Sequence, residues 1–309
     1  MDIQSLFRVP ERTKAGYAFA DTPVKISFKE SNVAVYGVPL DVTTSFGKGT
    51  SRGPEAIRLA SARQIETFVL DEKVDIYDLV DIYDLGDLKL PKAKSIVKTL
   101  EFLDSIIPKV VGSLRNDNKI PVMLGGEHTL TYYQLKALAG EEPVVIHFDA
   151  HRDMKPEYEG LKLCHTTPFY HLMEHIAGKN LIQIGIRQTD SKENQIAADN
   201  DVTTFDAWQV HDDIDSVAKH LEKVTAGKKI YISFDIDAYD IPYVPCTGTP
   251  EPFGLDPFQV MKLVKAISPS ARLIGMDMVE VGLKNDDYRE GALATQTLFR
   301  ILARKYARP

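Results

Sequence analysis

The stretch VVIHFDAHRD at residues 144–153 determines how the rest of the chain can be interpreted. Its first half is apolar, as in a buried parallel strand, and its second half places acidic and imidazole side chains at every other position. Because side chains alternate between the two faces of an extended segment, Asp149, His151 and Asp153 are predicted to point into one cavity. Carboxylates and imidazoles bind metals, so this strand end is predicted to open into a metal site.

Short runs rich in valine and isoleucine recur along the chain and are typical of buried strands. They lie at residues 33–38, 120–124, 144–148, 181–186, 230–234 and 273–276, and a further strand is expected to end at Gly86-Asp87. Helical patterns alternate with them. Helices are predicted from Gly53-Pro54 towards Phe68, over 96–114, from Asp256-Pro257 onward, and over about 290–305. Pro108 is expected to kink or end the second of these.

This alternation of strands and helices predicts an α/β fold with a mostly parallel sheet, helices on both faces and ligands at the carboxyl ends of the strands. A TIM barrel is the rival architecture. No low-complexity linker divides the 309 residues, so a single domain over 1–309 is expected.

The composition excludes several classes of protein. A formal net charge of −7 argues against a nucleic-acid partner. Residues 1–10 lack the apolar core of a signal peptide and no run approaches a membrane span, so a cytoplasmic protein without a membrane partner is expected. Cys164 and Cys246 are too few for a disulfide framework and are interpreted as small buried residues.

Two other strand ends carry ligand-type residues. Gly125-Gly126-Glu127-His128 follows one apolar run, and Ser233-Phe234-Asp235-Ile236-Asp237 closes another. Any one of these side chains alone would be read as a helix cap or a packed histidine. Together with residues 149–153 they supply two histidines and four aspartates, too many anions for one cavity without cations. The mixed ligands favour manganese over structural zinc, and six ligands indicate two ions, which would lower the pKa of a shared water and favour hydrolysis.

These three segments resemble the metal motifs of the ureohydrolase family, which contains arginases, agmatinases and their relatives. Further segments at 37–41, 53–58, 248–252 and 279–281 also resemble the family, in the family's order. The resemblance implies a three-layer α/β/α fold with an eight-stranded parallel sheet, two Mn²⁺ ions per subunit, and a homo-oligomer, either a trimer or a hexamer. It also implies that residues 1–29 form an N-terminal extension packing on the domain.

The resemblance implies a role for each matching residue. The metal ligands would be His128 and Asp153 for one ion, His151 and Asp237 for the other, and Asp149 and Asp235 for both. An activated water would attack a guanidinium carbon. Asp153 would relay the proton, Glu280 would bind the guanidinium nitrogens through two hydrogen bonds, and His165 would lie over the site and assist.

The loop over residues 155–165 resembles the corresponding loop of agmatinases, which implies hydrolysis of agmatine to putrescine and urea, a step of polyamine biosynthesis. Glu157 or Glu159 near the mouth would suit the cationic end of agmatine. The alternatives are guanidinobutyrate, arginine or formimidoylglutamate as the substrate of another amidinohydrolase. A two-metal phosphoesterase would need more basic residues, and a metal-binding relative without turnover is a non-enzymatic alternative.

The sequence does not decide the roles of two residues of the central stretch, Arg152 and His147. Arg152 occupies a position where the family commonly has threonine: it would support the sheet if it turns to the flank and repel a cationic substrate if it reaches the pocket. His147 shares a face with Asp149 further down the strand, where a hydrogen-bonded role is favoured over direct metal ligation.

Overall fold

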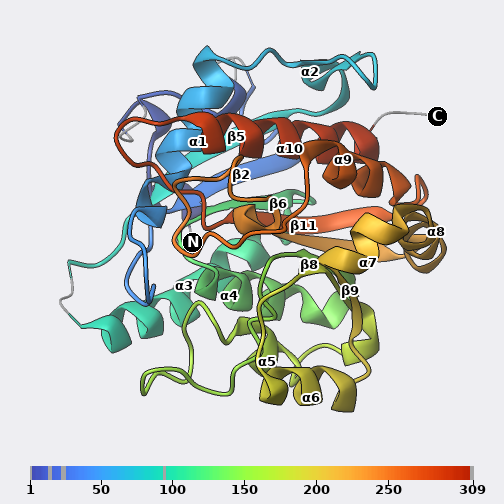
Figure 1. Ribbon diagram of the computed structural model, residues 1–309. Coiled ribbons are helices and arrows are strands. Elements are labelled where there is room, and N and C mark those ends of the chain that lie inside the picture. The colour runs from blue at the N-terminus through green and yellow to red at the C-terminus, as the bar shows by residue number, and fades with distance from the viewer. Residues whose placement is uncertain (1, 13–15, 22–25, 93–94, 307–309) are drawn as a thin grey trace.

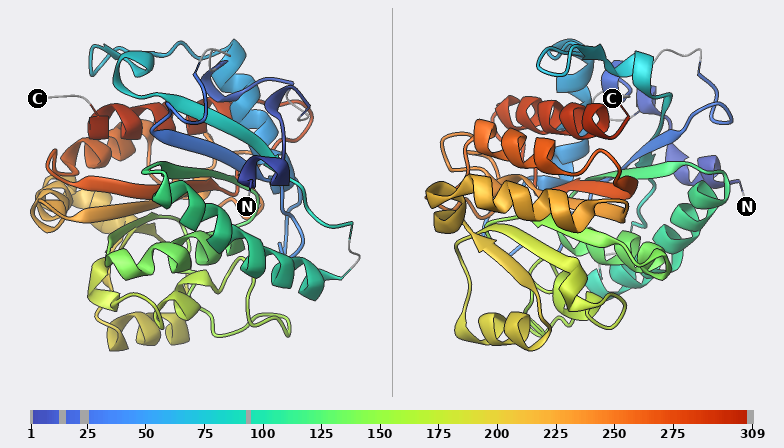
Figure 2. Two further views of the ribbon diagram at one scale, coloured as in Figure 1. Left: turned by 180° about the vertical axis from the view of Figure 1, so that it is seen from behind. Right: turned by 90° about the vertical axis from the view of Figure 1, so that its right-hand side faces the viewer.

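The computed structural model describes residues 2–12, 16–21, 26–92 and 95–306. A nine-stranded sheet forms the centre, with helices on both faces (Figures 1 and 2). Eight of its strands run parallel, in the spatial order β5 (Ile82–Leu88), β2 (Val33–Val38), β6 (Ile120–Gly125), β11 (Arg272–Val279), β10 (Lys229–Asp235), β7 (Val144–Phe148), β8 (Leu181–Ile186) and β9 (Thr203–Asp206).

The ninth strand, β1 (Phe7–Arg8), pairs antiparallel with β5 at one edge. The expected parallel sheet of eight strands is therefore confirmed, with one short strand added to it. Because β1 and β9 are its two open edges, the sheet is not a TIM barrel.

The helices divide into two layers. One layer packs against one face of the sheet and contains α1 (Gly53–Arg63), α7 (Ala207–Asp212), α8 (Ile214–Thr225), α9 (Pro257–Ala266) and α10 (Arg289–Tyr306). The opposite layer contains α3 (Ile96–Asn116), α4 (Thr129–Leu138), α5 (Pro168–Leu172) and α6 (Ser191–Asp199). A short helix, α2 (Ile76–Leu79), joins the first layer beside a two-stranded hairpin of β3 (Phe68–Val69) and β4 (Val74–Asp75).

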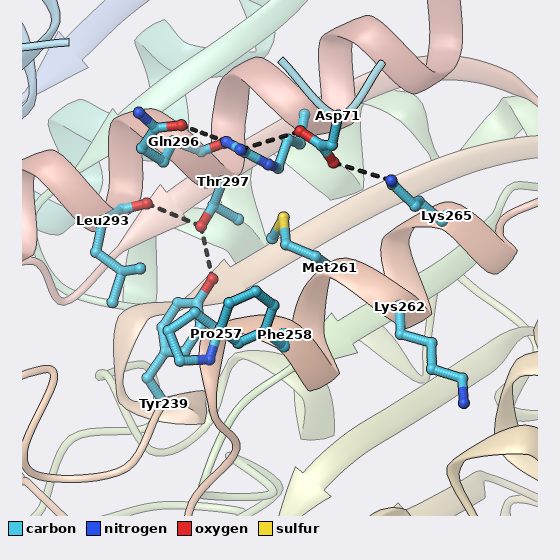
Figure 3. Close-up of a pocket in the computed structure, with 11 residues that line it drawn as sticks. Asp71, Tyr239, Pro257, Phe258, Met261, Lys262, Lys265, Leu293, Gln296 and Thr297 are labelled. Atoms are coloured by element: carbon cyan, nitrogen blue, oxygen red, sulfur yellow. Dashed lines mark hydrogen bonds and ion pairs between the residues drawn. The ribbon is translucent and has the colours of Figure 1, made fainter. Parts of the chain in front are cut away.

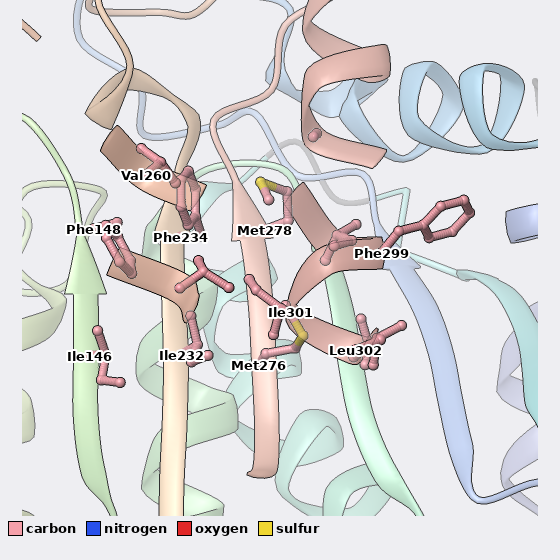
Figure 4. Close-up of a cluster of buried hydrophobic side chains, with 14 of the residues drawn as sticks. Ile146, Phe148, Ile232, Phe234, Val260, Met276, Met278, Phe299, Ile301 and Leu302 are labelled. Carbon is pink, nitrogen blue, oxygen red and sulfur yellow. The ribbon is translucent and has the colours of Figure 1, made fainter. Parts of the chain in front are cut away.

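Strand β2 shows why the strands read as continuous apolar runs. Val33 and Val35 pack into the core on the α1 and α10 side, whereas Ala34 and Tyr36 pack on the α3 and α4 side. Both faces of the strand are covered, so no polar alternation is needed. Figure 4 shows the first of these two faces on the strands β7, β10 and β11, whose side chains meet those of α9 and α10. Each fully buried side chain of this kind stabilises the fold by about 1.5–3 kcal/mol.

One predicted helix boundary was wrong, and a second helix passes through the proline that was expected to kink or end it. Helix α1 ends at Arg63, and Phe68 instead begins the small hairpin. Helix α3 continues past Pro108 to Asn116. Proline removes the N–H that would bond to the carbonyl of Asp104, but Asp104 is exposed, so water can take that place.

Four central neighbours of the sheet, β6, β11, β10 and β7, all present their carboxyl ends at the same edge. Strand β11 comes late in the chain and inserts between β6 and β10, so residues more than a hundred positions apart meet there. Such a change in strand order creates the crevice in which α/β proteins bind ligands. In the described ranges, no helix combines the length and apolar character needed to cross a membrane.

Candidate metal centre

His128 lies in the short segment that joins β6 to α4. Gly126 lies so close to the neighbouring loop that an added Cβ would sit 2.5 Å from the carbonyl oxygen of Leu40. A side chain there would push the two segments apart, so glycine allows the chain to pass. His128 then immediately precedes the first residue of α4 and is buried.

The side chain of His128 faces three carboxylates. Its Nδ1 lies 2.9 Å from Asp153 Oδ2, 3.0 Å from Asp149 Oδ2 and 3.2 Å from Asp235 Oδ2. Despite these short distances, the buried Nδ1 atom forms no hydrogen bond within the part of the chain that the structure describes. Asp149 and Asp153, which follow β7, and Asp235 at the end of β10 thus converge on the imidazole that follows β6.

A second group lies on the other side of Asp149. Nδ1 of His151 is 3.1 Å from Asp237 Oδ2 and 3.5 Å from Asp149 Oδ1. Asp237 is fixed because its Oδ1 accepts the backbone N–H of Ala150, and Asp235 accepts the N–H of Asp237. Asp149 therefore presents one oxygen to each group, which brings all six predicted ligands into one site.

The far side of the His128 ring explains its orientation. Nε2 of His128 lies 3.1 Å from Ser233 Oγ, and Ser233 in turn donates to the buried carboxylate of Asp277 at 2.8 Å. Because the single hydroxyl proton of Ser233 is used in this bond, its Oγ can only accept from the imidazole. Thr131 also donates to Asp277, so it does not compete for Ser233 Oγ. With its proton on Nε2, His128 turns the lone pair of Nδ1 toward the three carboxylates, an arrangement that suits a cation between them.

The electrostatics of the cluster agree with this interpretation. Burial, followed by the negative charge of Asp149, raises the pKa of Asp153 to about 7. Burial also raises the pKa of Asp235 well above its usual range, and Asp237 and Asp149 act in the same direction. For His128, burial lowers the pKa, but the surrounding carboxylates outweigh it and the pKa is raised. The cluster attracts positive charge, so these residues fit metal ions.

A cavity of about 180 Å³ opens over these residues. It is lined by five of the six predicted ligands, by Glu280 and His165, and by loop residues that include Ser45, Lys155, Tyr158, Gln188 and Glu251. Asp153 and Glu280 both have a left-handed backbone, with φ of 52° and 58°. This conformation is strained for residues with a side chain, and such strain concentrates at functional sites.

Glu280 and His165 both line the cavity, and each is held by a hydrogen bond. Oε1 of Glu280 accepts the backbone N–H of His128 at 2.8 Å, and burial raises the pKa of Glu280 well above its usual range. Nε2 of His165 lies 3.1 Å from Ser45 Oγ. Burial, followed by the charge of His151, lowers the pKa of His165 to about 4, so its ring is neutral at pH 7.

Glu127 is a structural member of the site that the sequence reasoning missed. Its buried carboxylate accepts the backbone N–H groups of Val42 and Thr43 and the hydroxyls of Thr43 and Thr129. Through these bonds it holds the loop after β2 against the cavity, where Thr43 accepts the N–H of His165. Its place beside His128, within the segment 125–128, was the only feature of the sequence that pointed to a role for it.

The loop over residues 155–165 contributes Lys155, Tyr158 and His165 to the cavity wall. Glu157 and Glu159 are exposed, and the described residues that line the cavity include Lys155, Tyr158 and Glu251 instead. Lys155 is paired with Asp190 at 2.6 Å and Glu193 at 3.2 Å. Glu157 and Glu159 are not among the described residues that line the cavity, whereas Tyr158 between them is, so their place near its mouth stays a prediction.

Arg152 turns away from the cavity and lies on the flank of the sheet. It hydrogen-bonds to Asn194, Gln183 and Thr204. His147 hydrogen-bonds to Asp149, and its nitrogen also lies within 4.8 Å of the ligand atoms of His128 and Asp149, so geometry alone would allow it to join a metal group. Cys164 and Cys246 are both buried and unpaired, as expected of packing residues.

A larger cavity of about 640 Å³ lies between α9 and α10 (Figure 3). Its charged residues are already engaged in ion pairs, because Asp71 pairs with both Lys265 and Arg300 and Lys262 pairs with Asp215, while the rest of the wall is mainly apolar. Among the described residues that line it, no group of metal-binding side chains resembles that at the strand ends. Size therefore does not identify the functional site here, and the chemistry of the smaller cavity does.

Comparison with known proteins is consistent across sequence and structure. A family model described as the arginase family matches residues 31–303. An N(1)-aminopropylagmatine ureohydrolase of Thermus thermophilus is 33% identical over 295 residues, 92% of each chain. An agmatinase of Halalkalibacterium halodurans is 31% identical over 281 residues, covering 89% of this chain and 92% of the relative. The crystal structure of an agmatine ureohydrolase of Thermoplasma volcanium superposes with a TM-score of 0.83 at 28% identity, covering 98% of this chain and 97% of the other.

Proposed function

This chain belongs to the arginase family, and on that premise we propose that it is an agmatinase-like ureohydrolase that converts agmatine to putrescine and urea. The observation that carries the proposal is the pair of His and Asp groups sharing Asp149, which open into a cavity walled by Glu280. We propose His128, Asp149, His151, Asp153, Asp235 and Asp237 as the metal ligands and two Mn²⁺ ions as the metals.

When bound, the two ions would supply the positive charge that activates a water near neutral pH. The protein's own residues would then do the rest. Glu280, fixed by its bond to the N–H of His128, would hold the guanidinium group through charge-assisted hydrogen bonds. Asp153, which lines the cavity beside His128, would accept the water proton and pass it to the departing amine. His165 would act as a neutral hydrogen-bonding group above the substrate.

A second substrate is favoured by the shape of the site. A neighbouring cavity of about 250 Å³ shares His151, Asp153, Lys155, Thr166 and Gln188 with the first and continues to Asp190 and Glu193. A longer tail carrying an additional amine would reach these two carboxylates, which share the single cation Lys155 and so leave one negative charge unbalanced. N(1)-aminopropylagmatine, the substrate named for the Thermus thermophilus relative, is therefore the second candidate.

We further propose a cytoplasmic homo-oligomer, a trimer or hexamer, that contributes to polyamine biosynthesis and has no nucleic-acid or membrane partner. These proposals derive from the family resemblance and the acidic composition.

The proposal is tested by measuring urea released by the purified, manganese-loaded protein from agmatine, N(1)-aminopropylagmatine, arginine, guanidinobutyrate and formimidoylglutamate, with formamide assayed in addition for the last compound. We expect the highest kcat/KM for agmatine or its aminopropyl derivative. Product from none of these compounds, from a protein that binds manganese, would instead support a metal-binding relative without turnover.

A further inference from the structure

Arg152 lies directly between two predicted metal ligands in sequence, yet its side chain leaves the cavity. Its Nη1 donates to Gln183 Oε1 at 2.8 Å and to Thr204 Oγ1 at 2.9 Å, and its Nε donates to Asn194 Oδ1 at 2.8 Å. All of these acceptors are neutral. A partly buried guanidinium bound to neutral partners is unusual, because buried cations are normally matched with carboxylates. Its position therefore calls for an explanation other than an ion pair.

Arg152 determines which way the buried amide of Gln183 points. The amide oxygen accepts from the guanidinium, and the amide nitrogen donates to the backbone oxygen of Arg152 at 2.9 Å. A reversed amide would set N–H groups against the guanidinium N–H and an oxygen against a carbonyl oxygen. Arg152 thus holds Gln183 by both ends, and the second N–H of the amide is left facing His147.

That N–H selects the form of the His147 ring. Nε2 of Gln183 lies 3.2 Å from Nδ1 of His147, so Nδ1 must act as the acceptor. A neutral imidazole that accepts at Nδ1 carries its proton on Nε2. Nε2 of His147 lies 2.7 Å from Asp149 Oδ2 and donates to it. The ring is fully buried and stacks on Phe169 at 3.9 Å between centroids, so it cannot turn easily.

Asp149 is the carboxylate shared by the two groups of the metal centre. Its Oδ2 takes the hydrogen bond from His147 and lies 3.0 Å from His128, and its Oδ1 accepts the N–H of His151. We propose that Arg152 is a positioning residue: through Gln183 it fixes the Nε2–H tautomer of His147, which in turn orients Asp149 between the two metal groups. This inference rests on the proposed metal centre and assigns His147 as a donor to Asp149, not a metal ligand.

The direct test is the protonation of His147, observed by NMR on protein with ¹⁵N-labelled histidine and no metal. In the unmodified protein we expect the proton on Nε2. Arg152→Met keeps the length of the side chain but removes its donors, and should give a mixture of the two tautomers. Asn194→Ala removes another acceptor of the same guanidinium and leaves the Gln183 contact, so it should retain the Nε2–H form.

Gln183→Glu provides the opposite perturbation and remains informative if Arg152→Met does not fold. The carboxylate keeps an acceptor for Arg152 but has no N–H for His147, so Nδ1 of His147 should gain a proton.

A separate experiment adds Cd²⁺, a diamagnetic probe, to the unmodified protein. We expect His147 to keep its Nε2 proton while the signals of His128 and His151 change. Loss of the His147 proton would show that Nε2 binds metal and would overturn the proposal.

Manganese affinity provides the functional readout. Loss of a group that orients a metal ligand typically weakens binding 10- to 100-fold, so a Kd for Mn²⁺ raised about 10-fold is expected for Arg152→Met, with Asn194→Ala close to the unmodified protein. An unchanged tautomer and an unchanged Kd in folded Arg152→Met would overturn the inference. If instead no urea is released but the tautomer responds as described, the proposed function fails and the positioning role stands.

Discussion

At the scale of single residues, Glu280 offers the sharpest test of substrate binding. Its Oε1 is occupied by the N–H of His128, and the side chain lines the cavity. In Glu280→Gln the amide oxygen can keep the bond to His128, but an NH₂ group then replaces the other carboxylate oxygen. That group would repel a guanidinium, which has only donors. We expect kcat/KM for urea release to fall by about 10- to 100-fold, the loss of one hydrogen bond to a charged group.

The control for this variant is the affinity for manganese measured by calorimetry. Glu280 is not among the proposed ligands, so the Kd for Mn²⁺ should stay within about twofold of the unmodified value, a difference of less than about 0.5 kcal/mol. An unchanged kcat/KM would show that the guanidinium is held elsewhere. A lost manganese affinity would show that Glu280 belongs to the metal site.

Arg58 is the residue on which the packing of the amino-terminal half depends. Its buried guanidinium binds Asp84 with two hydrogen bonds, at 2.7 and 3.0 Å, and also binds Asp87. Asp84 in turn accepts the N–H of Phe19, which holds the segment before β2 against α1 and β5. Removing the cation would leave a carboxylate buried without its partner.

We therefore expect Arg58→Met to lower the free energy of unfolding by about 3–5 kcal/mol in urea titrations. Arg52→Ala serves as the matched control near the start of the same helix, because its partner Glu55 is one helical turn away and the pair is partly exposed. That variant should cost less than about 1 kcal/mol. Equal effects of the two variants would contradict a special role for the buried cluster.

At the scale of elements, Glu290 joins two loops to the start of α10. Its Oε1 accepts the N–H groups of Cys246 and Thr247, and its Oε2 accepts that of Gly282. All three partners are backbone donors, so an amide cannot replace the carboxylate. We expect Glu290→Gln to lower the free energy of unfolding by about 1–3 kcal/mol, since the N–H of Gly282 would face an NH₂ group.

Glu127→Gln is the comparison that isolates this effect. One oxygen of Glu127 accepts only from the hydroxyls of Thr43 and Thr129, which can rotate and accept from an amide instead. In metal-free protein it should therefore cost less than Glu290→Gln. The reverse order in urea unfolding would refute the assignment of donors and acceptors in these two loops.

The sequence predicted those elements that are governed by local patterns. Six buried strands were recognised because valine and isoleucine fill both faces. The start of α9 was predicted because Asp256 caps the helix and Pro257 is its first residue. Strand β9 (Thr203–Asp206), at the edge, was missed because its residues are only partly buried and polar. The end of α1 was missed because its residues continue an apolar pattern into a hairpin.

In the candidate site, too, the features set by local sequence were predictable and those set by contacts between distant segments were not. Its proposed ligands follow strands directly, so spacing within each segment brings them to one edge of the sheet. The contacts that orient them are not local: Gln183 reaches His147 from the neighbouring strand, and Asp277 reaches Ser233 from another. Which side Arg152 takes also depends on β8 and β9 being at that edge, which no pattern in residues 149–153 reveals.

At the scale of the whole molecule, metal binding should couple the site to global stability. The proposed ligands come from the ends of β6, β7 and β10, and without cations their clustered carboxylates destabilise the folded state. Each manganese site filled at about 100 times its Kd should add about 2.7 kcal/mol to the free energy of unfolding, and a chelator should reverse the resulting rise of Tm. Asp149→Asn removes the carboxylate common to both groups, so it should abolish the manganese-dependent rise, while the exposed Glu159→Gln should preserve it. A full rise in Asp149→Asn would mean that the stabilising ion binds outside this centre.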